Sequence, residues 1–286
     1  MNEPPSAQAS TDAPSDSQGE PSPAERPSYL DAPPLSPPEG FAKACGEAGV
    51  SLTPDEIDRL SRYMGMLLAA NKAFNLTAIR DPGVAWTRHV LDSLTLLGVI
   101  AEIEAPEGRP LRVIDVGTGG GLPGIPLAIA RPDVSVTLLD ATAKKCAFLG
   151  HVTRELDLND VEVVCARAEA AGRDRGERTS AGRSGGRREA YDLVVARAVG
   201  RLPTLCELTV PFARVGGLIA LIKGAQAEEE LAEAKGALHL LHAAHAGTAP
   251  TGTGRIVVLE KQRPTPKLYP RRDGEPKRAP LGVASK

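Results

Sequence analysis

The sequence predicts an α/β fold, a doubly wound and mainly parallel sheet with helices on both faces. Two observations support this prediction: from residue 111 onward short β-rich segments alternate with helical ones, and a glycine-rich turn follows the first β-rich segment. Strands that alternate with helices form parallel sheets, because each connection crosses back over the sheet. The expected strands are 111–116, 134–140, 161–165, 191–196, 217–222 and 254–259, and the expected helices are 123–130, 144–156 and 226–245.

A small helical subdomain, residues 41–105, is expected before the sheet. A short helix is expected to end at Gly49, and Thr-Pro-Asp-Glu at 53–56 has the pattern of a helix start. Its Thr can cap the helix, its Pro suits the first helical position and its Glu completes a capping box. A further helix is expected over about 84–97. Apolar residues then follow a helical period, which predicts one buried stripe: Ile57, Leu60, Met64, Leu67 and Leu68.

Two segments are expected to lie outside the folded core. Residues 1–40 contain ten Pro, seven Ser and seven acidic residues against one basic residue, so we expect this extension to be disordered. Residues 171–190 contain six Arg and five Gly, with no aliphatic side chain larger than alanine, which predicts a flexible surface loop. The main domain is therefore expected over 106–270, with 171–190 as an insertion in it.

The charges are distributed unevenly along the chain. The net charge of −2 argues against a strongly basic nucleic-acid binder. The last 25 residues, however, contain seven basic and two acidic residues. We therefore expect a basic C-terminal tail, 271–286, that suits an acidic partner.

Membrane and metal functions are not expected. No apolar run is long enough to cross a bilayer, and the N-terminus lacks a basic region followed by an apolar core, so we expect a cytoplasmic protein with no membrane partner. The four Cys are scattered without a CxxC pair and the five His show no metal-ligand spacing, so no metal is expected. The oligomeric state stays open; without coiled-coil heptads, a monomer is the expectation.

A glycine-rich loop joins the first expected strand to a helix. It reads Asp-Val-Gly-Thr-Gly-Gly-Gly-Leu-Pro-Gly over 115–124. Glycine lets the backbone turn sharply and lets a ligand approach closely. Rossmann-like sheets bind their cofactors beyond the carboxyl ends of the strands, so we expect a cofactor site at this loop.

Two classes of cofactor fit the loop. The spacing Gly-x-Gly-x-x-Gly at 119–124 matches the dinucleotide fingerprint. However, Asp115 would repel a pyrophosphate and would suit the ammonium group of a methionine moiety, as in S-adenosylmethionine. Pro123 also removes a backbone donor from the first turn of the helix, which weakens it as a phosphate site. Asp140 ends the second expected strand and suits ribose hydroxyls in either class.

The loop lies within a longer string that resembles the signature of the RsmG family, also called GidB. This string is Val-Ile-Asp-Val-Gly-Thr-Gly-Gly-Gly-Leu-Pro-Gly-Ile-Pro-Leu at 113–127. Members of that family are bacterial S-adenosylmethionine-dependent methyltransferases that methylate N7 of a guanine in 16S ribosomal RNA. The resemblance covers about residues 41–281. Other matching segments occur in the expected order at 71–77, 88–93, 137–140, 167–169, 196–198, 221–224 and 269–272.

The resemblance implies a fold, a cofactor and a set of cofactor contacts. The fold is a Rossmann-like methyltransferase fold with a seven-stranded sheet, the cofactor is S-adenosyl-L-methionine, and the activity is rRNA methylation. The loop pattern itself adds Asp115, Gly119 and Gly121 to the expected cofactor site. The positions that the resemblance matches to cofactor contacts are Gly117 and Leu122 in the loop, Asp140 at the ribose, Ala168 and Glu169 beside the adenine, and Arg197.

Such a methyl transfer requires little of the protein beyond positioning the methyl donor and the guanine. Guanine N7 carries a free lone pair at neutral pH and loses no proton on methylation, so no general base is expected. Orienting the two reactants is the main remaining contribution. The implied partner is 16S ribosomal RNA or a precursor of the small ribosomal subunit. The candidate RNA contacts are basic residues in the helical subdomain, at a strand end and in the tail: Lys72, Arg88, Lys223, Arg271 and Arg272.

Two other functions stay open at this point. One is an NAD(P)-dependent oxidoreductase on a Rossmann fold, although no proton-relay residue is evident after the later strands. The other is a non-catalytic ribosome-binding factor that keeps a vestigial pocket. Neither the target nucleotide, apart from the resemblance, nor the choice between naked RNA and an assembled subunit follows from the sequence.

Overall fold

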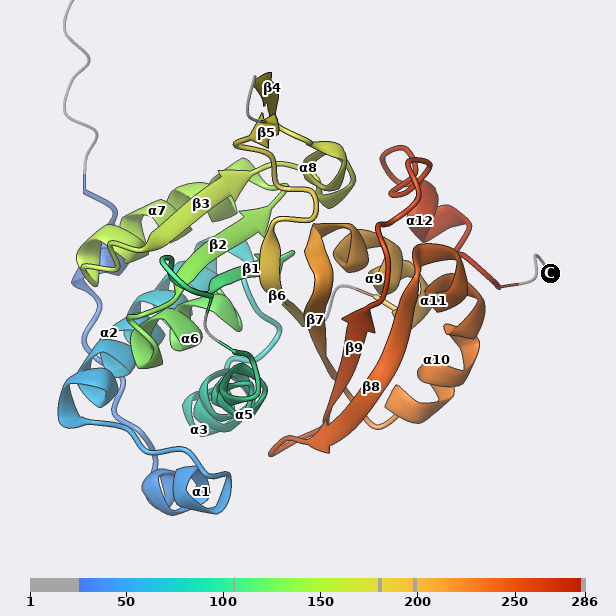
Figure 1. The fold of residues 1–286 in the computed structure, drawn as a ribbon. Helices are drawn as coiled ribbons and strands as arrows, with labels where there is room; N and C mark the ends of the chain where they lie inside the picture. Colours follow the sequence, from blue (N-terminus) through green and yellow to red (C-terminus); the bar gives the residue numbers. More distant parts are fainter. Residues whose placement is uncertain (1–25, 105, 180–181, 198–199, 284–286) are drawn as a thin grey trace, which may run out of the picture.

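A computed structural model of the chain describes residues 26–104, 106–179, 182–197 and 200–283, with the backbone alone for 178–179 and 182–184. Seven strands form one sheet in the order β3-β2-β1-β6-β7-β9-β8 (Figure 1). The doubly wound α/β fold class is therefore confirmed. The strands are β1 (Arg112–Val116), β2 (Ser135–Asp140), β3 (Val161–Cys165), β6 (Tyr191–Arg197), β7 (Ala213–Lys223), β8 (Ala243–Pro250) and β9 (Arg255–Lys261).

One strand of the sheet runs against the others. β1 pairs in parallel with β2 and β6, β2 with β3, and β6 with β7, whereas β9 is antiparallel to both β7 and β8. The carboxyl ends of β1, β2, β3, β6 and β7 consequently lie along one edge of the sheet, where Rossmann-like proteins place their ligands.

The expectation of a helix over 226–245 is wrong at its end. The helices α10 (Ala227–Glu233) and α11 (Lys235–Leu241) stop at His242, which has a positive φ of 61°. β8 begins at the next residue and pairs with β9 from Ala243 to Pro250. The alanine-rich composition of this segment fits a helix, but the exposed edge of β9 pairs with it as a strand, because tertiary pairing overrides weak propensity.

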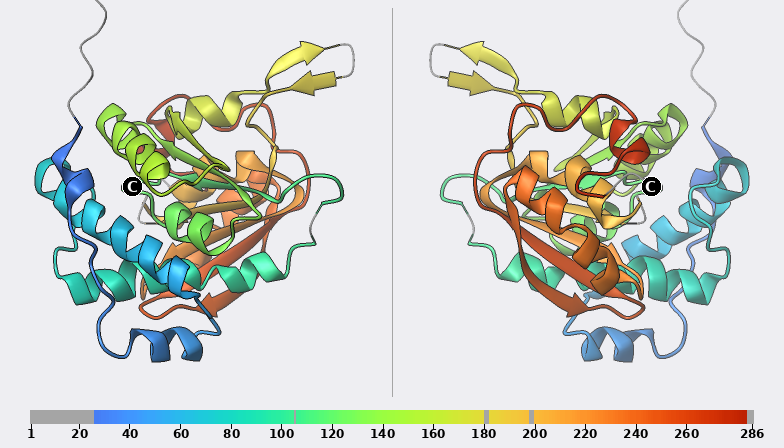
Figure 2. Two further views of the ribbon diagram at one scale, coloured as in Figure 1. Left: turned by 90° about the vertical axis from the view of Figure 1, so that its left-hand side faces the viewer. Right: turned by 90° about the vertical axis from the view of Figure 1, so that its right-hand side faces the viewer.

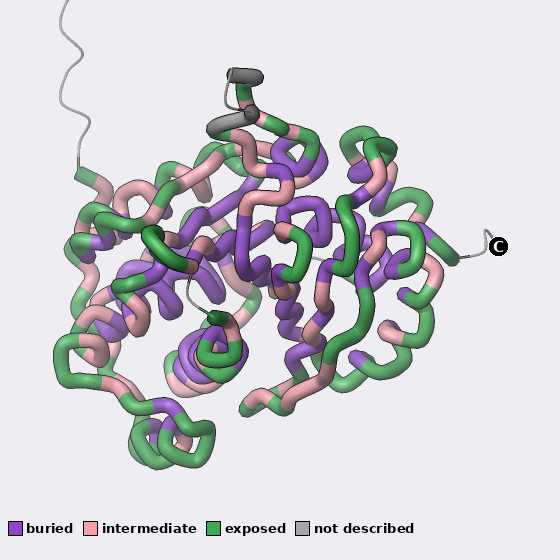
Figure 3. The backbone as a smooth tube through the Cα atoms, viewed as in Figure 1, coloured by how far each residue is buried: buried purple, intermediate pink, exposed green. Residues whose placement is uncertain are grey.

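Two apolar cores lie on the two faces of the sheet. Leu193 and Val195 of β6 belong to one core and Val194 and Ala196 to the other, as the alternation of a strand requires. The strands at the centre of the molecule are the most deeply buried part of the chain (Figure 3). In the part of the chain that the structure describes, no helix is both long and apolar enough to cross a membrane. The helices α6 (Gly124–Ala130) and α7 (Ala143–Glu155) cover one face, and α8 (Ala168–Arg173) and α9 (Leu202–Thr209) cover the other.

The N-terminal helices pack on the first of these faces. The long helix α2 (Pro54–Phe74) begins with the expected capping box, in which Thr53 and Glu56 bond each other's backbone N–H groups. It packs against α6 and α7 (Figure 2). Leu60, Met64 and Leu67 of its apolar stripe belong to the same core as one face of the sheet. This region therefore shares one core with the main domain. Its other elements are α1 (Phe41–Glu47), α3 (Pro82–Ala85), the π-helical segment η2 (Trp86–Leu91), α4 (Asp92–Leu94) and α5 (Leu97–Ala101).

The expected disordered extension is wrong for residues 26–40, while residues 1–25 lie outside the described residues. A 3₁₀ turn, η1 (Ser28–Asp31), places the Tyr29 ring 6.1 Å from that of Phe74 and 5.4 Å from that of Phe148, measured between centroids. The Leu35 N–H donates to the Ser61 carbonyl at 2.8 Å. Aromatic packing thus fixes a segment whose Pro-rich composition suggested disorder.

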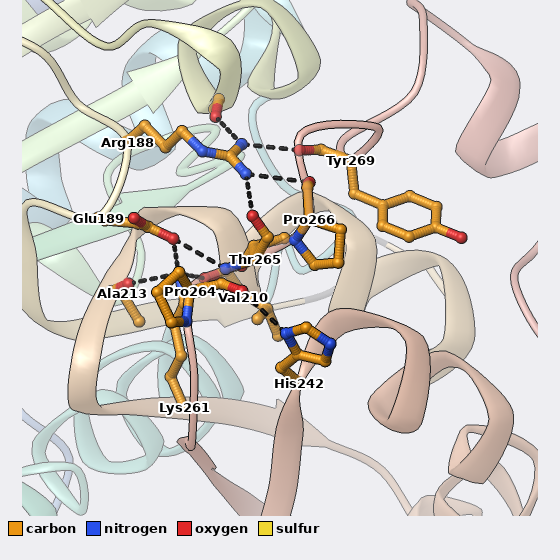
Figure 4. Close-up of polar contacts among 11 residues, drawn as sticks. Arg188, Glu189, Val210, Ala213, His242, Lys261, Pro264, Thr265, Pro266 and Tyr269 are labelled. Carbon is orange, nitrogen blue, oxygen red and sulfur yellow. Dashed lines mark hydrogen bonds and ion pairs between the residues drawn. The ribbon is translucent and has the colours of Figure 1, made fainter.

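The expectation of a loop over 171–190 is also wrong in part. α8 ends at Arg173, and the antiparallel strands β4 (Glu177–Thr179) and β5 (Gly182–Ser184) form a hairpin. After it, the buried Arg188 guanidinium donates to the carbonyl oxygens of Gly172, Thr265, Pro266 and Tyr269 (Figure 4). An arginine-rich composition is typical of solvated loops, but one of these arginines binds the backbone at Gly172 and at residues 265–269.

A buried lysine extends this contact. Lys261 is fully buried, and its Nζ donates to Glu189 at 2.9 Å and to the Ala213 carbonyl at 2.8 Å (Figure 4). Burial lowers the pKa of Lys261 to about 8, although the Glu189 carboxylate favours its charged form. Arg188 and Lys261 together fix residues 262–272 against the end of the sheet.

The chain end is not a free basic tail as far as residue 283, and 284–286 lie outside the described residues. The Arg271 guanidinium bonds the fully buried Glu207 carboxylate, with the shortest contact at 2.6 Å. The short helix α12 (Glu275–Arg278) follows and packs against α9. The expected RNA contact at Arg271 stays a prediction, but a buried counter-ion on α9 already pairs with its charge.

Asp192 links three elements at the amino end of the sheet and gives folding a measurable dependence on pH. Its fully buried carboxylate accepts hydrogen bonds from Arg109, Arg214 and the Arg112 N–H. Burial opposes its ionisation, but these hydrogen bonds outweigh burial and lower the pKa of Asp192 to about 2. A pKa lower in the folded than in the unfolded chain stabilises the fold above about pH 4, and this contribution disappears as the pH falls toward 2.

We predict that Asp192→Asn removes this dependence. The free energy of unfolding of the wild type should exceed that of the variant most above about pH 4, and the difference should shrink by about 2 kcal/mol between about pH 4 and pH 2. Urea unfolding followed by circular dichroism measures it. Glu47→Gln, in an exposed pair with Lys43, is the control and should follow the wild type. A constant difference across this range would contradict the prediction.

Candidate active site

The glycine-rich loop connects β1 to α6, and its glycines have two structural roles. Gly117 and Gly119 have positive φ values of 72° and 61°, a conformation that side chains disfavour, and both line cavities described below. Gly121 instead lies against protein: a Cβ there would come within 2.5 Å of an Ile125 side-chain carbon. Gly121 also has a positive φ, of 100°, permits close packing of the loop and lines neither cavity, so its contact with the cofactor stays a prediction.

Asp115 lies beneath this loop and is fully buried. Its Oδ2 accepts hydrogen bonds from the Thr118 hydroxyl at 2.5 Å and from the Gly124 N–H at 2.8 Å. Burial raises its pKa to about 7 against the influence of these two hydrogen bonds. The structure places the Asp115 carboxylate on the underside of the loop, where it lines neither cavity, and its contact with an ammonium group stays a prediction.

The hydrogen bonds at the start of α6 decide between the two classes of cofactor. The Gly124 N–H is bonded to Asp115, and the Ile125 N–H is bonded to the Gly121 carbonyl. Positions 123 and 126 are prolines and have no N–H to donate. A dinucleotide pyrophosphate needs free N–H groups at this point, so the loop does not fit a dinucleotide.

A first cavity of about 490 Å³ lies beyond the carboxyl ends of β1, β2 and β3. Gly117, Asp140, Ala168 and Glu169, all predicted cofactor contacts, line it. The Asp140 carboxylate is held in place because it accepts hydrogen bonds from the Gly119 N–H at 3.0 Å and the Thr142 N–H at 2.8 Å. The resulting cavity has an acidic group at a strand end, as a nucleoside site requires.

The C-terminal segment forms one wall of the first cavity, which sequence reasoning missed. Gly274, Lys277 and Pro280 line the cavity, and the Gly274 N–H donates to Glu169 at 2.8 Å. Arg173 and Arg167 also pair with Asp273 in this segment. The basic composition of the segment suggested a role in RNA binding and gave no sign of a cavity wall.

A second cavity, also about 490 Å³, lies between the glycine loop, the N-terminal helices and the ends of β6 and β7. It shares Gly117 with the first cavity, and Gly119 and Leu122 also line it. Arg197 reaches it from the end of β6, as expected for a charge at a strand's carboxyl end. The two cavities therefore adjoin at Gly117 of the loop.

A hydrogen-bonded series of three side chains forms one side of the second cavity. Arg197 donates to the Arg88 carbonyl and, at 2.9 Å, to Nδ1 of His89. Nε2 of His89 lies 2.8 Å from the Thr77 hydroxyl oxygen. Burial and the neighbouring Arg197 charge lower the pKa of His89 to about 3, so the imidazole is neutral at physiological pH.

A polar contact across the chain closes the same cavity. The buried Asp92 accepts hydrogen bonds from both the N–H and the hydroxyl of Thr253 in the turn between β8 and β9. Both residues line the cavity. The contact joins α4, in the N-terminal region, to the turn between β8 and β9 near the end of the chain.

In the structure the predicted RNA contacts fall into two groups, exposed cations and cations that pair with a carboxylate. Arg88 is exposed at the second cavity, and Arg272 is exposed without an ion pair among the described residues. Lys72 is exposed on α2 but lines neither cavity. Lys223 lines the second cavity, yet its Nζ lies 2.7 Å from Glu230 and donates to the Gly200 carbonyl. With Arg271 bound to Glu207, these pairings leave Lys72, Arg88 and Arg272 as the exposed cations of the set.

The fully buried Tyr63 supports the glycine loop from the N-terminal side and escaped the sequence analysis. Its hydroxyl donates to the Gly120 carbonyl at 2.8 Å. Burial raises its pKa well above the ordinary value. The position lies beside the apolar stripe of α2, so its pattern predicts only a core residue.

The fold and the two joined cavities define a Rossmann-like protein of the S-adenosylmethionine-dependent methyltransferase class. A family model described as GidB, rRNA small subunit methyltransferase G, matches residues 56–255. The chain belongs to this family. Proteins named ribosomal RNA small subunit methyltransferase G are 49% identical over 239 residues in Sorangium cellulosum (84% of this chain, 94% of the relative) and 40% identical over 248 residues in Leuconostoc citreum (85% and 98%).

We predict that Tyr63→Phe destabilises the fold by about 1–3 kcal/mol, because the buried Gly120 carbonyl loses its donor while the ring still fills its space. Chemical unfolding measures the loss. Tyr29→Phe is the matched control, since the Tyr29 hydroxyl bonds the half-buried His151 and can be replaced by water. Equal stability of Tyr63→Phe and the wild type would show that the loop does not depend on this hydroxyl.

Proposed function

We propose that this protein transfers a methyl group from S-adenosyl-L-methionine to N7 of a guanine in 16S ribosomal RNA. The observation that carries the proposal is the junction of the two cavities at Gly117. A methyl donor and a nucleobase need adjoining sites that open onto each other. Family membership supports both the cofactor and the RNA substrate.

The cofactor contacts are assigned by where each residue lies. Asp140, Ala168 and Glu169 would hold the nucleoside half in the first cavity. Gly117, Gly119, Leu122 and Arg197 would surround the methionine half at the junction. When bound, the cofactor supplies a methyl group already activated by a sulfonium. Asp115 and Gly121 act indirectly, since they fix the shape of the loop.

The protein's own contribution is to position the base, because attack by N7 releases no proton. Two observations argue against His89 as a base: its Nδ1 accepts a hydrogen bond from Arg197, and its pKa is lowered to about 3. The fixed orientation of the two reactants lowers the barrier.

The RNA is proposed to approach from the side of the second cavity. Arg88 is exposed there, and Lys72 and Arg272 are exposed elsewhere. Phosphate contacts of this kind give affinity that falls with salt concentration. We propose 16S ribosomal RNA or a precursor of the small subunit as the partner, and a monomeric, cytoplasmic protein.

The two alternatives make different predictions. An oxidoreductase would need free N–H groups at the start of α6, and the structure has them bonded or replaced by proline. A non-catalytic ribosome-binding factor would bind RNA without transferring methyl groups, so the measurement below separates it from an enzyme.

We predict that Gly117→Arg abolishes methyl transfer, because a side chain there would fill the junction of the cavities. Transfer of labelled methyl groups to 16S RNA or small subunits, followed by mass spectrometry of the nucleosides, measures N7-methylguanosine. Gly108→Arg is the matched control, since Gly108 has a similar φ of 74° in open space. Wild-type protein that binds the RNA but forms no N7-methylguanosine would refute the proposed function.

A further inference from the structure

Thr77 is a polar residue of the second cavity to which neither the motif nor the cofactor site assigns a role. It lies in the connection between α2 and α3, is half-buried and lines the cavity together with the glycine loop. Its N–H donates to the Asn71 side chain at 2.8 Å, which fixes the position of the residue. The direction of the hydrogen bonds at its hydroxyl determines what this residue can recognise.

These directions follow from Arg197, which has only donors. Because a guanidinium N–H of Arg197 points at Nδ1 of His89, Nδ1 has to be the acceptor nitrogen. In a neutral imidazole the other nitrogen, Nε2, then carries the hydrogen and donates to the Thr77 oxygen at 2.8 Å. The Ile79 N–H donates to the same oxygen at 3.1 Å.

Both lone pairs of the Thr77 hydroxyl oxygen are therefore occupied. A threonine hydroxyl is ordinarily ambiguous, since it can donate one hydrogen bond and accept two. Here it can only donate, and its hydrogen has no acceptor among the described residues. The other threonines at the cavity, Thr118 and Thr253, donate theirs to Asp115 and Asp92. Thr77 is thus the one threonine of this cavity, within the described ranges, with a donor left for a ligand.

A hydroxyl that can only donate distinguishes guanine from adenine. Beside N7, guanine presents the O6 acceptor, whereas adenine presents an amino donor at the same place. We propose that the Thr77 hydroxyl donates to O6 of the target guanine, and that the Arg197–His89 pair excludes adenine by keeping Thr77 from accepting. This assignment rests on the proposed function.

The uncharged hydroxyl also suits the reaction. The guanine ring gains positive charge as N7 is methylated, so a cationic donor at O6 would be repelled as the reaction proceeds. A neutral donor orients the base with a smaller penalty. We therefore expect Thr77 to act in binding and selection of the base, and its loss to raise KM more than it lowers kcat.

The test is a double-mutant cycle in which one change is made in the protein and the other in the RNA base. RNA carrying guanine, 2-aminopurine or adenine at the methylated position is offered to the wild type, Thr77→Val and Thr77→Ser. 2-Aminopurine keeps N7 and lacks O6. In the wild type, loss of O6 should lower kcat/KM by about 5- to 10-fold, the effect of one hydrogen bond. Thr77→Val should lose a similar factor on guanine and little on 2-aminopurine, so that removal of O6 costs the variant less than it costs the wild type, while Thr77→Ser should restore the wild-type preference.

The cycle separates a contact to the base from a structural effect. If Thr77→Val lost the same factor on 2-aminopurine as on guanine, the two changes would be independent and the proposal would be wrong. If the wild type methylated no guanine at all, the proposed function would fail instead, and the assignment of Thr77 with it. Melting temperatures of the variants show whether they fold.

A second measurement requires no turnover. The ¹⁵N spectrum of histidine-labelled protein should show His89 with a bare Nδ1 and a protonated Nε2 near pH 7. Protonation at Nδ1 would reverse the direction of the hydrogen bonds and contradict the proposal.

Discussion

The glycine loop depends on one buried carboxylate. Asp115 accepts hydrogen bonds from Thr118 inside the loop and from the first N–H of α6, so it fixes the loop at both ends. A carboxylate at the N-terminal end of a helix is favourably placed, and it occupies the donors that a phosphate would need. The same contact therefore shapes the site for the cofactor and excludes dinucleotides. Other parts of the site, such as Tyr63 beneath Gly120 and Asp140 beside Gly119, support a loop that Asp115 already holds.

The strands and the loop could be predicted because their patterns are local. The short apolar runs of β1, β2 and β6, and the glycines after β1, lie within short stretches of sequence. The capping box at Thr53 is also complete within four residues, and the structure confirms it. β8 was missed because its alanines resemble a helix, and only its pairing with β9 makes it a strand.

Contacts over long separations could not be predicted from these patterns. Tyr63 and Gly120 are 57 positions apart, and His89 and Arg197 are 108 apart. Nothing in either neighbourhood indicates that the two meet. Charge was misleading for the same reason: Arg271 and Lys223 look like surface cations in the sequence, and each has a buried or nearly buried carboxylate partner from another element.

The contact between Asp92 and Thr253 spans 161 positions, and the wall formed by Gly274 comes from still nearer the chain end. Synthesis proceeds from the N-terminus, so the glycine loop leaves the ribosome well before the residues that enclose it. A growing chain cannot assemble either cavity until almost all of its length has been made. Chains that end before Gly274 therefore lack one wall of the first cavity, and chains that end before Thr253 also lack the contact with Asp92 at the second cavity.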